Sequence, residues 1–361
     1  MHSWDVLSSF DTSLESRVRD ILRCVDEKPW RQIETVPPWL EVLVMNILQE
    51  ELDGTSPDDS YYYVCMRCLR ALGKARNVVP ESFILGGIRR KGNFPCTGGG
   101  LSDVWEGDMG GKPVCLKVLR TFSLSNCEKE ALLKDLCREA LVWKQLHHKN
   151  IVPFLGINYE HFKPRCCLIS PWMKNGNIIS FLKTNKHHDR IKCILELADA
   201  VEFLHGLNPR IVHGDIRGEN ILVDDELRCC LADFGSNISV ATQAPSESSM
   251  SHSSLRWLAP ELQVYDPELY DQECLPGRDI YAFGCTVIEI FTLKPPFSHI
   301  QPAAILYRIY SGERHPRPSP SVFPSDQLWK LVEQCMSLQP KERPTASDVK
   351  HVLAHMQIPV L

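Results

Sequence analysis

The sequence predicts an α+β chain in which helices and short strands are grouped into separate regions. Apolar runs of strand length, such as 114–119 and 221–223, lie between polar or glycine-rich turns. Elsewhere, and most clearly after residue 190, apolar residues recur at the spacing of amphipathic helices. A length of 361 residues, with 43% hydrophobic and 24% charged residues, suits a globular protein with more than one domain.

The region 1–79 is expected to be helical and to form a unit of its own. An apolar stripe on one helical face is followed by a break at two prolines, and further helices are expected over 39–52 and 61–72. Residues 80–93 would link this unit to the next. Such helices suit either structural support for the following domain or a homotypic or partner-binding module that controls it. The stripe comprises Leu14, Val18, Ile21, Leu22 and Val25.

Composition and charge argue against several classes of function. The net charge of −5 and the isoelectric point near 6.2 indicate no basic surface for nucleic acid. No apolar stretch is long enough to cross a bilayer, and the first residues lack the basic start and apolar run of a signal peptide. The fifteen cysteines are scattered, and Cys65 and Cys68 have no second pair at the spacing of a zinc site. We therefore expect a cytoplasmic protein with reduced thiols, no nucleic-acid partner and no membrane insertion.

Phosphoryl transfer from a nucleotide needs a particular set of side chains, and one part of the sequence contains them. Asp215 and Asn220 stand five positions apart in the run His-Gly-Asp-Ile-Arg-Gly-Glu-Asn, and Asp233-Phe234-Gly235 follows. One carboxylate must orient the attacking hydroxyl, while an amide oxygen and a second carboxylate must hold Mg²⁺ against the phosphates. An isolated Asp-Phe-Gly is more often a plain turn. Because two short apolar strands separate it from Asn220, the catalytic interpretation is favoured here.

Further elements of the same chemistry lie upstream. Lys117 is enclosed by the apolar run 114–119, where a buried charge needs a partner or a bound anion. Glu139, in the helical segment 130–146, offers the matching carboxylate. The glycine-rich turn 97–107 would let the backbone approach phosphate oxygens closely. Each feature has a plain alternative, namely an edge-strand lysine, a solvated helix face and an ordinary hairpin, but their order along the chain favours a common site.

These motifs together resemble the catalytic domain of protein kinases, over roughly seven tenths of the chain. The segment 168–177 resembles the strand and hinge of that family, and 253–261 resembles the end of its activation region. The resemblance implies a bilobal fold over 94–353, preceded by the small helical N-terminal unit and followed by a short tail, 354–361. The smaller lobe, 94–171, would be an antiparallel sheet with one helix, and the larger lobe, 172–353, would be mainly helical. The wider pattern looks like the tyrosine-kinase-like group in its fungal form.

The resemblance also implies a function, namely transfer of the γ-phosphoryl group of ATP to hydroxyls of protein substrates with Mg²⁺ as cofactor. Asp215 would orient the hydroxyl, and His213 would brace its loop. Asp279 would cap the backbone of that loop, and Glu261 would pair with Arg343. The other catalytic residues are expected to be Lys117, Glu139, Arg217 and Asn220, with Asn220 and Asp233 as metal ligands. Contacts to the nucleotide are expected from Thr97, Gly98, Gly99, Gly100, Val104, Cys115, Lys117, Ser170, Pro171, Met173, Leu222 and Asp233.

Three departures from the family pattern qualify this hypothesis. Thr97 and Ser102 stand where the glycine-rich loop usually has glycines. Gly214 replaces an arginine that receives the activation-segment phosphate, so we expect activity not to depend on phosphorylation of the serine-rich segment 242–254. Arg217 replaces the lysine of serine/threonine kinases but keeps its charge, which favours serine/threonine specificity.

Two other functions compete with a protein kinase. One is a catalytically weak pseudokinase that acts as a scaffold through its N-terminal helices. The other is a kinase for a small-molecule alcohol. The intact set of Lys117, Glu139, Asp215, Asn220 and Asp233 argues against the first, and the Ala-Pro-Glu closure at 259–261 argues against the second.

Overall fold

The structure is a computed structural model, and it describes most of the chain. The described residues are 11–24, 28–57, 59–76, 78–99, 102–120, 126–163, 165–208, 210–234, 255–262, 275–301, 304–323 and 325–356. Expectations that involve Gly100, Gly235, the segment 242–254 and residues 357–361 therefore fall outside the described residues. The chain divides into two compact units. The first unit contains Met1–His147 and Pro153–Trp172, and the second contains His148–Val152 and Met173–Leu361.

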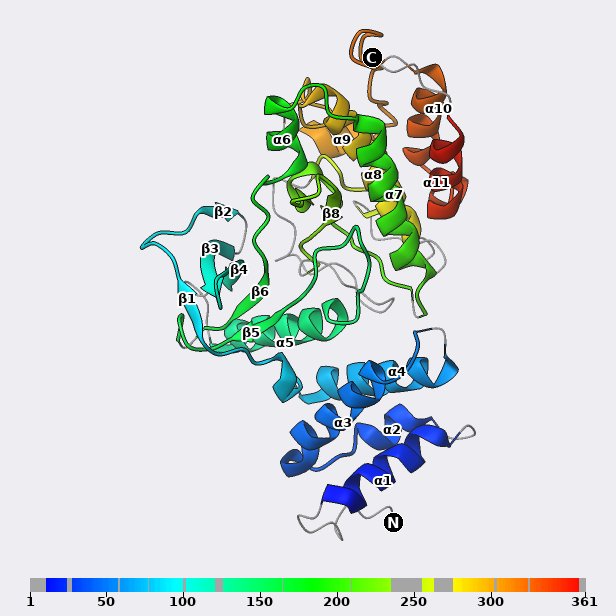
Figure 1. Ribbon diagram of the computed structural model, residues 1–361. Helices are drawn as coiled ribbons and strands as arrows, with labels where there is room; N and C mark the ends of the chain where they lie inside the picture. The colour runs from blue at the N-terminus through cyan, green and yellow to red at the C-terminus, as the bar shows by residue number, and fades with distance from the viewer. Residues whose placement is uncertain are drawn as a thin grey trace. The chain divides into compact units, whose positions relative to one another are not determined.

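The first unit begins with helices that pack around an apolar core (Figure 1). The sequence missed α2, because five residues beginning with proline are too few to show a helical period. Leu14, Val18 and Leu22, from the expected stripe, are buried, as are Leu48 of α3 and Leu69 of α4. The helical unit expected at the N-terminus is thus present. Its helices are α1 (Asp11–Arg23), α2 (Pro29–Ile33), α3 (Glu41–Asp53) and α4 (Ser60–Arg76).

An antiparallel sheet and one helix make up the rest of the first unit. Within the described residues, six strands pair in the order β1-β3-β4-β6-β5, with β2 paired to β3. Strand β1 lies inside the stretch 80–93 that was expected to be only a linker. A three-residue strand with one buried residue, Ile88, carries too little periodicity to be seen in the sequence. The elements are β1 (Ile88–Arg90), β2 (Thr97–Gly99), β3 (Ser102–Met109), β4 (Lys112–Leu119), α5 (Asn126–Trp143), β5 (Gly156–Asn158) and β6 (Cys167–Pro171).

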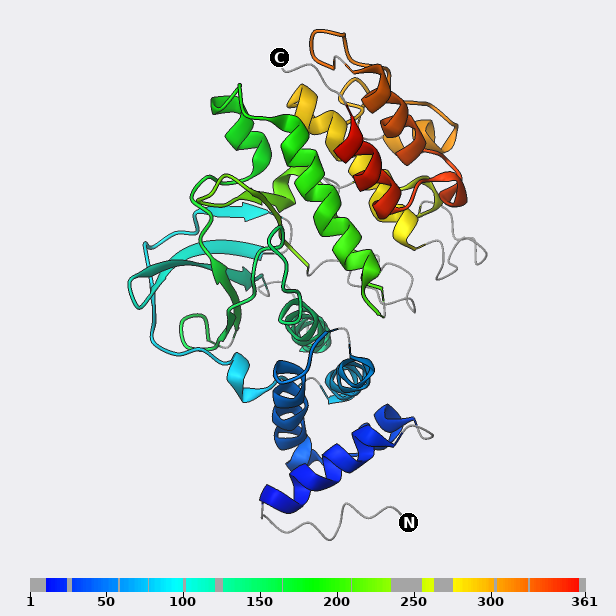
Figure 2. The ribbon, with the colours of Figure 1, turned by 45° about the vertical axis from the view of Figure 1, so that its right-hand side comes forward.

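Over its described residues, the second unit is mainly helical, as expected, and contains one β-hairpin (Figure 2). Helix α8 is buried over most of its length, α10 and α7 pack against it, and α11 lies along α7. Helices α7 to α11 lie from residue 190 onward, where helical spacing of apolar residues is clearest in the sequence, whereas the short α6 precedes that stretch. The elements are α6 (Ile178–Thr184), α7 (Arg190–Gly206), β7 (Ile221–Val223), β8 (Cys229–Leu231), α8 (Pro276–Thr292), α9 (Ile305–Tyr310), α10 (Asp326–Cys335) and α11 (Ala346–His355).

One buried ion pair within the second unit agrees with the sequence analysis. The guanidinium of Arg343 donates to both carboxylate oxygens of Glu261, at 2.6 and 2.7 Å. Both side chains are almost fully excluded from solvent, with exposed fractions of 0% and 2%. A search of the described helices finds none long and apolar enough to cross a membrane.

Candidate active site

One face of the sheet in the first unit collects several residues that were expected to contact the nucleotide. Residues directly opposite each other on neighbouring strands share a face. The register pairs Thr97 with Val104, Val104 with Lys117, and Cys115 with Ser170. Cys115 and Lys117 are two residues apart on β4 and therefore also share this face. Five residues that are far apart in sequence are thus brought to one surface.

The opposite face of the sheet is the hydrophobic core of this unit. Strand β4 buries every second residue, so only one side of its apolar run is fully buried. The lysine lies on the less buried side, because side chains alternate between the two faces. Trp105 and Leu85 also pack against the core residues. The core cluster comprises Ile88, Val114, Leu116, Val118, Phe162, Cys167 and Ile169.

Lys117 forms an ion pair with Glu139 of helix α5. Its Nζ atom lies 3.7 Å from Oε1 of Glu139, and the two side chains are 16% and 5% exposed. This distance is an ion-pair distance rather than a hydrogen-bond distance. The carboxylate of Glu139, which was expected to match this lysine, therefore lies beside it.

The glycine-rich turn has a structural reason for at least one of its glycines. A Cβ atom at Gly98 would lie 2.3 Å from the guanidinium of Arg120. That guanidinium donates to Oδ1 of Asp103 at 2.7 and 2.9 Å, which ties the start of β3 to the residue after β4. Gly98 therefore leaves room for an ion pair, in addition to the close backbone approach that the sequence predicted.

The strand β6 leads directly into the expected hinge. Pro171 pairs with Val114 at the end of the strand, and the Trp172 N–H donates to the Pro113 carbonyl at 3.2 Å. The Met173 carbonyl accepts from the N–H of Gly176, which closes the following turn at 3.1 Å.

In the second unit, a buried carboxylate holds the loop that contains Asp215. The backbone N–H groups of His213 and Gly214 donate to the two oxygens of Asp279, each at 2.8 Å. His205 donates to the same carboxylate at 2.9 Å. Burial alone would raise the pKa of Asp279, but these donors outweigh it and lower the pKa below its ordinary value. The capping role expected for Asp279 is confirmed.

His213 braces the loop from within. Its Nε2–H donates to the Ala232 carbonyl at 3.0 Å, and its Nδ1 accepts from the N–H of Asp215 at 3.2 Å. The ring of Phe234, which is fully buried, meets the imidazole edge-on at a centroid distance of 5.0 Å. This histidine therefore connects the loop before β7 with the chain after β8.

Asp215 lies within a polar cluster that contains Asn220 and Arg217. The Asn220 amide nitrogen donates to the Asp215 carboxylate at 2.9 Å and to its carbonyl at 2.8 Å. Arg217 Nε lies 3.4 Å from the same carboxylate. Burial is the main reason that the pKa of Asp215 is raised, and the negative charge of Asp233 adds to this effect. The charges of Arg217 and His213 oppose it.

Asp233 has an unusual backbone conformation. Its φ angle is +65°, in the left-handed region that aspartate adopts more readily than most residues. Asn220 lies directly before β7, and Asp233 lies two residues after the end of β8. The N–H of Ala232 donates to the carbonyl of Asn220 at 2.8 Å. The pairing of the two strands thus brings residues from before and after the hairpin together.

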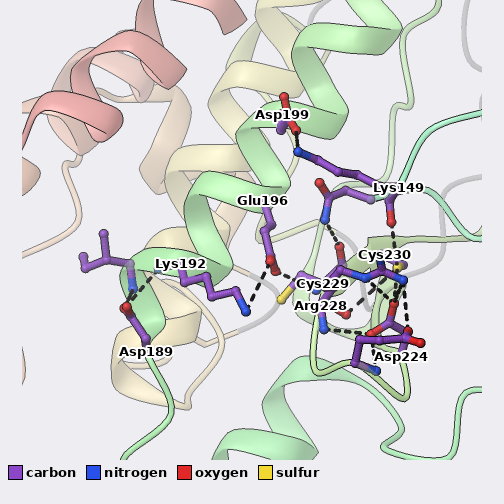
Figure 3. A network of polar contacts seen from close by, with 12 residues as sticks. Lys149, Asp189, Lys192, Glu196, Asp199, Asp224, Arg228, Cys229 and Cys230 are labelled. Carbon is purple, nitrogen blue, oxygen red and sulfur yellow. Dashed lines mark hydrogen bonds and ion pairs between the residues drawn. The ribbon is translucent and has the colours of Figure 1, made fainter.

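A polar network fixes this hairpin from outside (Figure 3). Asp224 closes the turn by accepting from the backbone and side chain of Arg228, both at 2.8 Å. Glu196 of α7 accepts from the Cys229 N–H at 2.8 Å, while Asn150 donates to the Cys229 carbonyl. On the other edge of the hairpin, the Val223 N–H donates to the Gly176 carbonyl at 2.9 Å. The hairpin is thus hydrogen-bonded at its turn and along both edges, which restricts movement of the ends that carry Asn220 and Asp233.

Sequence reasoning predicted Asp279 but missed two further polar residues on the same side of α8. Thr286 donates to the Ile216 carbonyl at 3.1 Å, and Glu289 accepts from the Gly218 N–H at 2.8 Å. A Cβ at Gly218 would lie 2.4 Å from the Ile179 side chain, which would have to move to admit a larger residue. The missed signal is spacing, because residues 279, 286 and 289 fall on one side of a helix that is otherwise apolar.

The donor set of the second unit fits Mg²⁺. Asn220 directs its amide nitrogen at Asp215, which leaves its Oδ1 atom as the group directed elsewhere. Together with the Asp233 carboxylate, it offers two hard oxygen donors, and Mg²⁺ usually takes one or two protein oxygens plus phosphates and water. Among the described residues, no cluster of three or more His, Cys, Asp or Glu side chains suits a metal bound by protein alone.

A bilobal α+β fold, a buried Lys–Glu pair and an Asp–Asn–Asp set define the catalytic domain of a phosphotransferase of the protein kinase type. The sequence model of the protein tyrosine and serine/threonine kinase family matches residues 96–353. The chain belongs to this family.

The curated relatives carry kinase names. "Probable serine/threonine-protein kinase SIS8" of Arabidopsis thaliana is 28% identical over 267 residues, which is 73% of this chain and 24% of that protein. "MAP3K epsilon protein kinase 1" of the same plant is 31% identical over 243 residues, 66% of this chain and 16% of that protein. "Dual specificity protein kinase shkC" of Dictyostelium discoideum is 27% identical over 265 residues, 72% of this chain and 50% of that protein. The chain thus spans half or less of the length of these relatives.

Proposed function

We propose that this protein transfers the γ-phosphoryl group of ATP to serine and threonine hydroxyls of protein substrates. The observation that carries the proposal is the cluster of Asp215, Asn220 and Asp233 around one braced hairpin, in a chain of the kinase family. The proposed catalytic domain is 94–353, with lobes 94–171 and 172–353, and the family match over 96–353 supports it. The scaffold alternative is not favoured, because no member of the catalytic set is missing.

The chemistry follows from how each group is held. Asp215 accepts the hydroxyl proton as the substrate oxygen bonds to the γ-phosphorus and the bond to the ADP oxygen breaks. Lys117, held by Glu139, binds the α- and β-phosphates, and Arg217 stabilises the charge of the transferred group. Asn220 and Asp233 would hold Mg²⁺, which would neutralise part of the negative charge of the phosphates.

The proposed nucleotide contacts extend beyond the catalytic cluster. The sheet face with Thr97, Val104, Cys115 and Ser170 would meet the adenosine, and Leu222 would pack on its other side. Since Pro171 has no N–H and Trp172 donates within the sheet, the N–H of Met173 would serve the adenine edge. The glycines 98–100 would approach the phosphates.

Finer assignments are also proposed. The hinge Pro171-Trp172-Met173 and the run 255–261 support placement in the tyrosine-kinase-like group of fungal type. Arg217 supports a preference for serine and threonine, in line with the name of the Arabidopsis thaliana relative SIS8. The net charge of −5 supports a cytoplasmic protein with no nucleic-acid partner. The helices in 1–79 would, in addition, bind a protein partner.

The proposal is tested by phosphate transfer from radiolabelled ATP with Mg²⁺, to the chain itself and to a generic basic protein. Asp215→Asn keeps the size of the side chain and removes the proton acceptor, so it should lower the rate about 10²- to 10⁴-fold. Asp225→Asn is the matched control, since Asp225 lies exposed in the β7–β8 turn and pairs only loosely with Lys174. We expect the radiolabel to appear on serine and threonine. The native chain and the Asp225→Asn control should transfer phosphate at equal rates.

Label on tyrosine alone would refute the specificity. Absence of transfer by the native chain at saturating ATP would refute the activity and return attention to the scaffold alternative. An active Asp215→Asn variant would remove Asp215 from the role of proton acceptor.

A further inference from the structure

Helix α5 is buried on all sides near the residue that pairs with Lys117. Four consecutive residues, Ala140 to Trp143, are each 5% exposed or less. Successive helical residues point about 100° apart, so four of them cover the full circumference. A helix that is buried all round must be packed against more than one partner. The sheet, through the Lys117–Glu139 pair, accounts for one side only.

The N-terminal helices cover another side of α5. Leu141 projects about 200° away from Glu139 around the helix axis. It meets Gly73 of α4, where a Cβ atom would lie 2.2 Å from Leu141 Cδ1 and 3.8 Å from the terminal methyl of Met45 in α3. Figure 1 shows α4 beside α5, in agreement with their contacts. The three helices therefore meet at Gly73, where a side chain would require the buried Leu141 side chain to move.

A buried polar contact fixes the same arrangement. Gln145, just after α5, donates to the side-chain oxygen of Gln49 in α3 at 2.8 Å. Gln49 in turn donates to Asp53 at 2.8 Å. Both glutamines are nearly excluded from solvent, so a shift of α5 along α3 would leave amide groups unsatisfied at a considerable cost.

An aromatic cluster ties the end of α5 to the segment after α4. The rings of Phe83 and Phe154 lie 5.6 Å apart, and those of Phe154 and Trp143 lie 5.4 Å apart. Trp143 is the last residue of α5. The helical part of the first unit thus contacts α5 along one side and at its C-terminal end.

We propose that the N-terminal helices are a positioning element for the reaction. By holding α5 at Gly73 and at the Gln49–Gln145 pair, they set the place of Glu139 and hence of Lys117. This inference rests on the proposed kinase function. Gly73 and Gln49 are positioning residues, since they act through α5 rather than on the nucleotide.

The test begins with Gly73→Ala in the full chain. Alanine favours a helix interior over glycine, so the substitution has no intrinsic cost for α4 itself. Its methyl group would displace the Leu141 side chain, and because Leu141 is buried we expect the displacement to be passed on to α5. Because a misplacement of about 1 Å at a reacting group can cost about 10²-fold, we expect kcat/KM for ATP to fall at least about tenfold. The affinity for a fluorescent ATP analogue with Mg²⁺ should fall as well, and amides of α5 should exchange faster with solvent.

Two further variants isolate the contact. Gly54→Ala is the matched control, because a Cβ at Gly54 would meet nothing closer than a carbonyl at 3.4 Å. It should behave as the native chain does. Leu141→Val removes the methyl group that the new Cβ would strike. Added to Gly73→Ala, it should restore kcat/KM to within about threefold, as expected for directly coupled residues.

The inference fails if Gly73→Ala matches Gly54→Ala in nucleotide affinity, kinetics and exchange of α5. It also fails if the loss of activity only follows the unfolded fraction while folded molecules bind nucleotide as tightly as the native chain. A native chain that binds nucleotide but transfers no phosphate would refute the proposed function alone, and affinity and exchange would still decide the role of Gly73. A native chain that does neither would overturn both.

Discussion

Glu289 of α8 carries a carboxylate directly behind the catalytic loop. Its Oε2 atom accepts from the Gly218 N–H at 2.8 Å and from the Trp257 indole at 3.1 Å. Burial is the main cause that raises the pKa of Glu289 to about 7, and the two donors only partly offset it. Glu289→Gln keeps an acceptor oxygen for both donors and removes the charge. The substitution should therefore change how stability depends on pH.

The sign and size follow from linkage. In the unfolded chain the pKa is 4.5, so the folded state holds the proton more tightly. The resulting stabilisation is fully present below about pH 4.5 and is lost as pH rises through about 7. A difference of about 2.5 pH units, at about 1.36 kcal/mol per unit, corresponds to about 3 kcal/mol. Relative to the native chain, Glu289→Gln should gain about 2 to 3 kcal/mol between about pH 5 and about pH 8.

The assay is urea unfolding followed by far-ultraviolet circular dichroism at several pH values. Glu202→Gln is a control of opposite sign, because a hydrogen bond from Lys350 is the first cause that lowers the pKa of Glu202. Its contribution is present at neutral pH and is lost as pH falls through the lowered pKa. Parallel pH curves for the native chain and Glu289→Gln would refute the reasoning, since they would mean that Glu289 titrates as it does in the unfolded chain.

Three further predictions concern the second unit. Glu261→Gln leaves the buried Arg343 charge without its partner and should lower the free energy of unfolding by about 3 to 5 kcal/mol, measured by urea unfolding at neutral pH. Gly214→Arg places a side chain at a φ of +77° and should lower the free energy of unfolding by about 1 to 2 kcal/mol. Because glycine stands at this position, treatment of the native chain with phosphatase should leave its rate of phosphate transfer unchanged. Phosphate transfer needs the ionised carboxylate of Asp215, and burial raises the pKa of this group above 3.8. On acidification, the transfer rate should therefore begin to fall before the pH reaches 3.8. A rate that stays unchanged down to about pH 4 would contradict the raised pKa.

Much of the candidate site could be predicted because its chemistry demands particular residue types in a particular order. Asp215, Asn220 and Asp233 were identified from the sequence, and the structure brings them to one hairpin. Their local geometry depends on neighbours in the chain, such as the strand pairing that joins Asn220 to Ala232. Local pairing of this kind leaves a visible pattern of short apolar strands around a turn.

Other features were invisible for physical reasons. The strand β1 and the helices α2 and α6 are too short to show a period. Both faces of β4 carry apolar residues, so the sequence does not show which face is buried, and the burial and pairing of the strand are needed to place Lys117 on the face of Cys115. Periodicity reports which side of an element is apolar, but not which element covers it.

The contact between the N-terminal helices and α5 belongs to this second class, and it bears on the two interpretations of that region. Gln49 and Gln145 are 96 positions apart, so no local pattern connects them. A hydrogen bond of this kind adds little net stability but is costly to leave unmade, whereas the apolar contact at Gly73 supplies attraction without fixing a register. Together they specify one position of α5. Support for the fold and control of activity are then not separate alternatives, because any ligand or partner that prefers one packing of α3 and α4 would also prefer one position of Glu139.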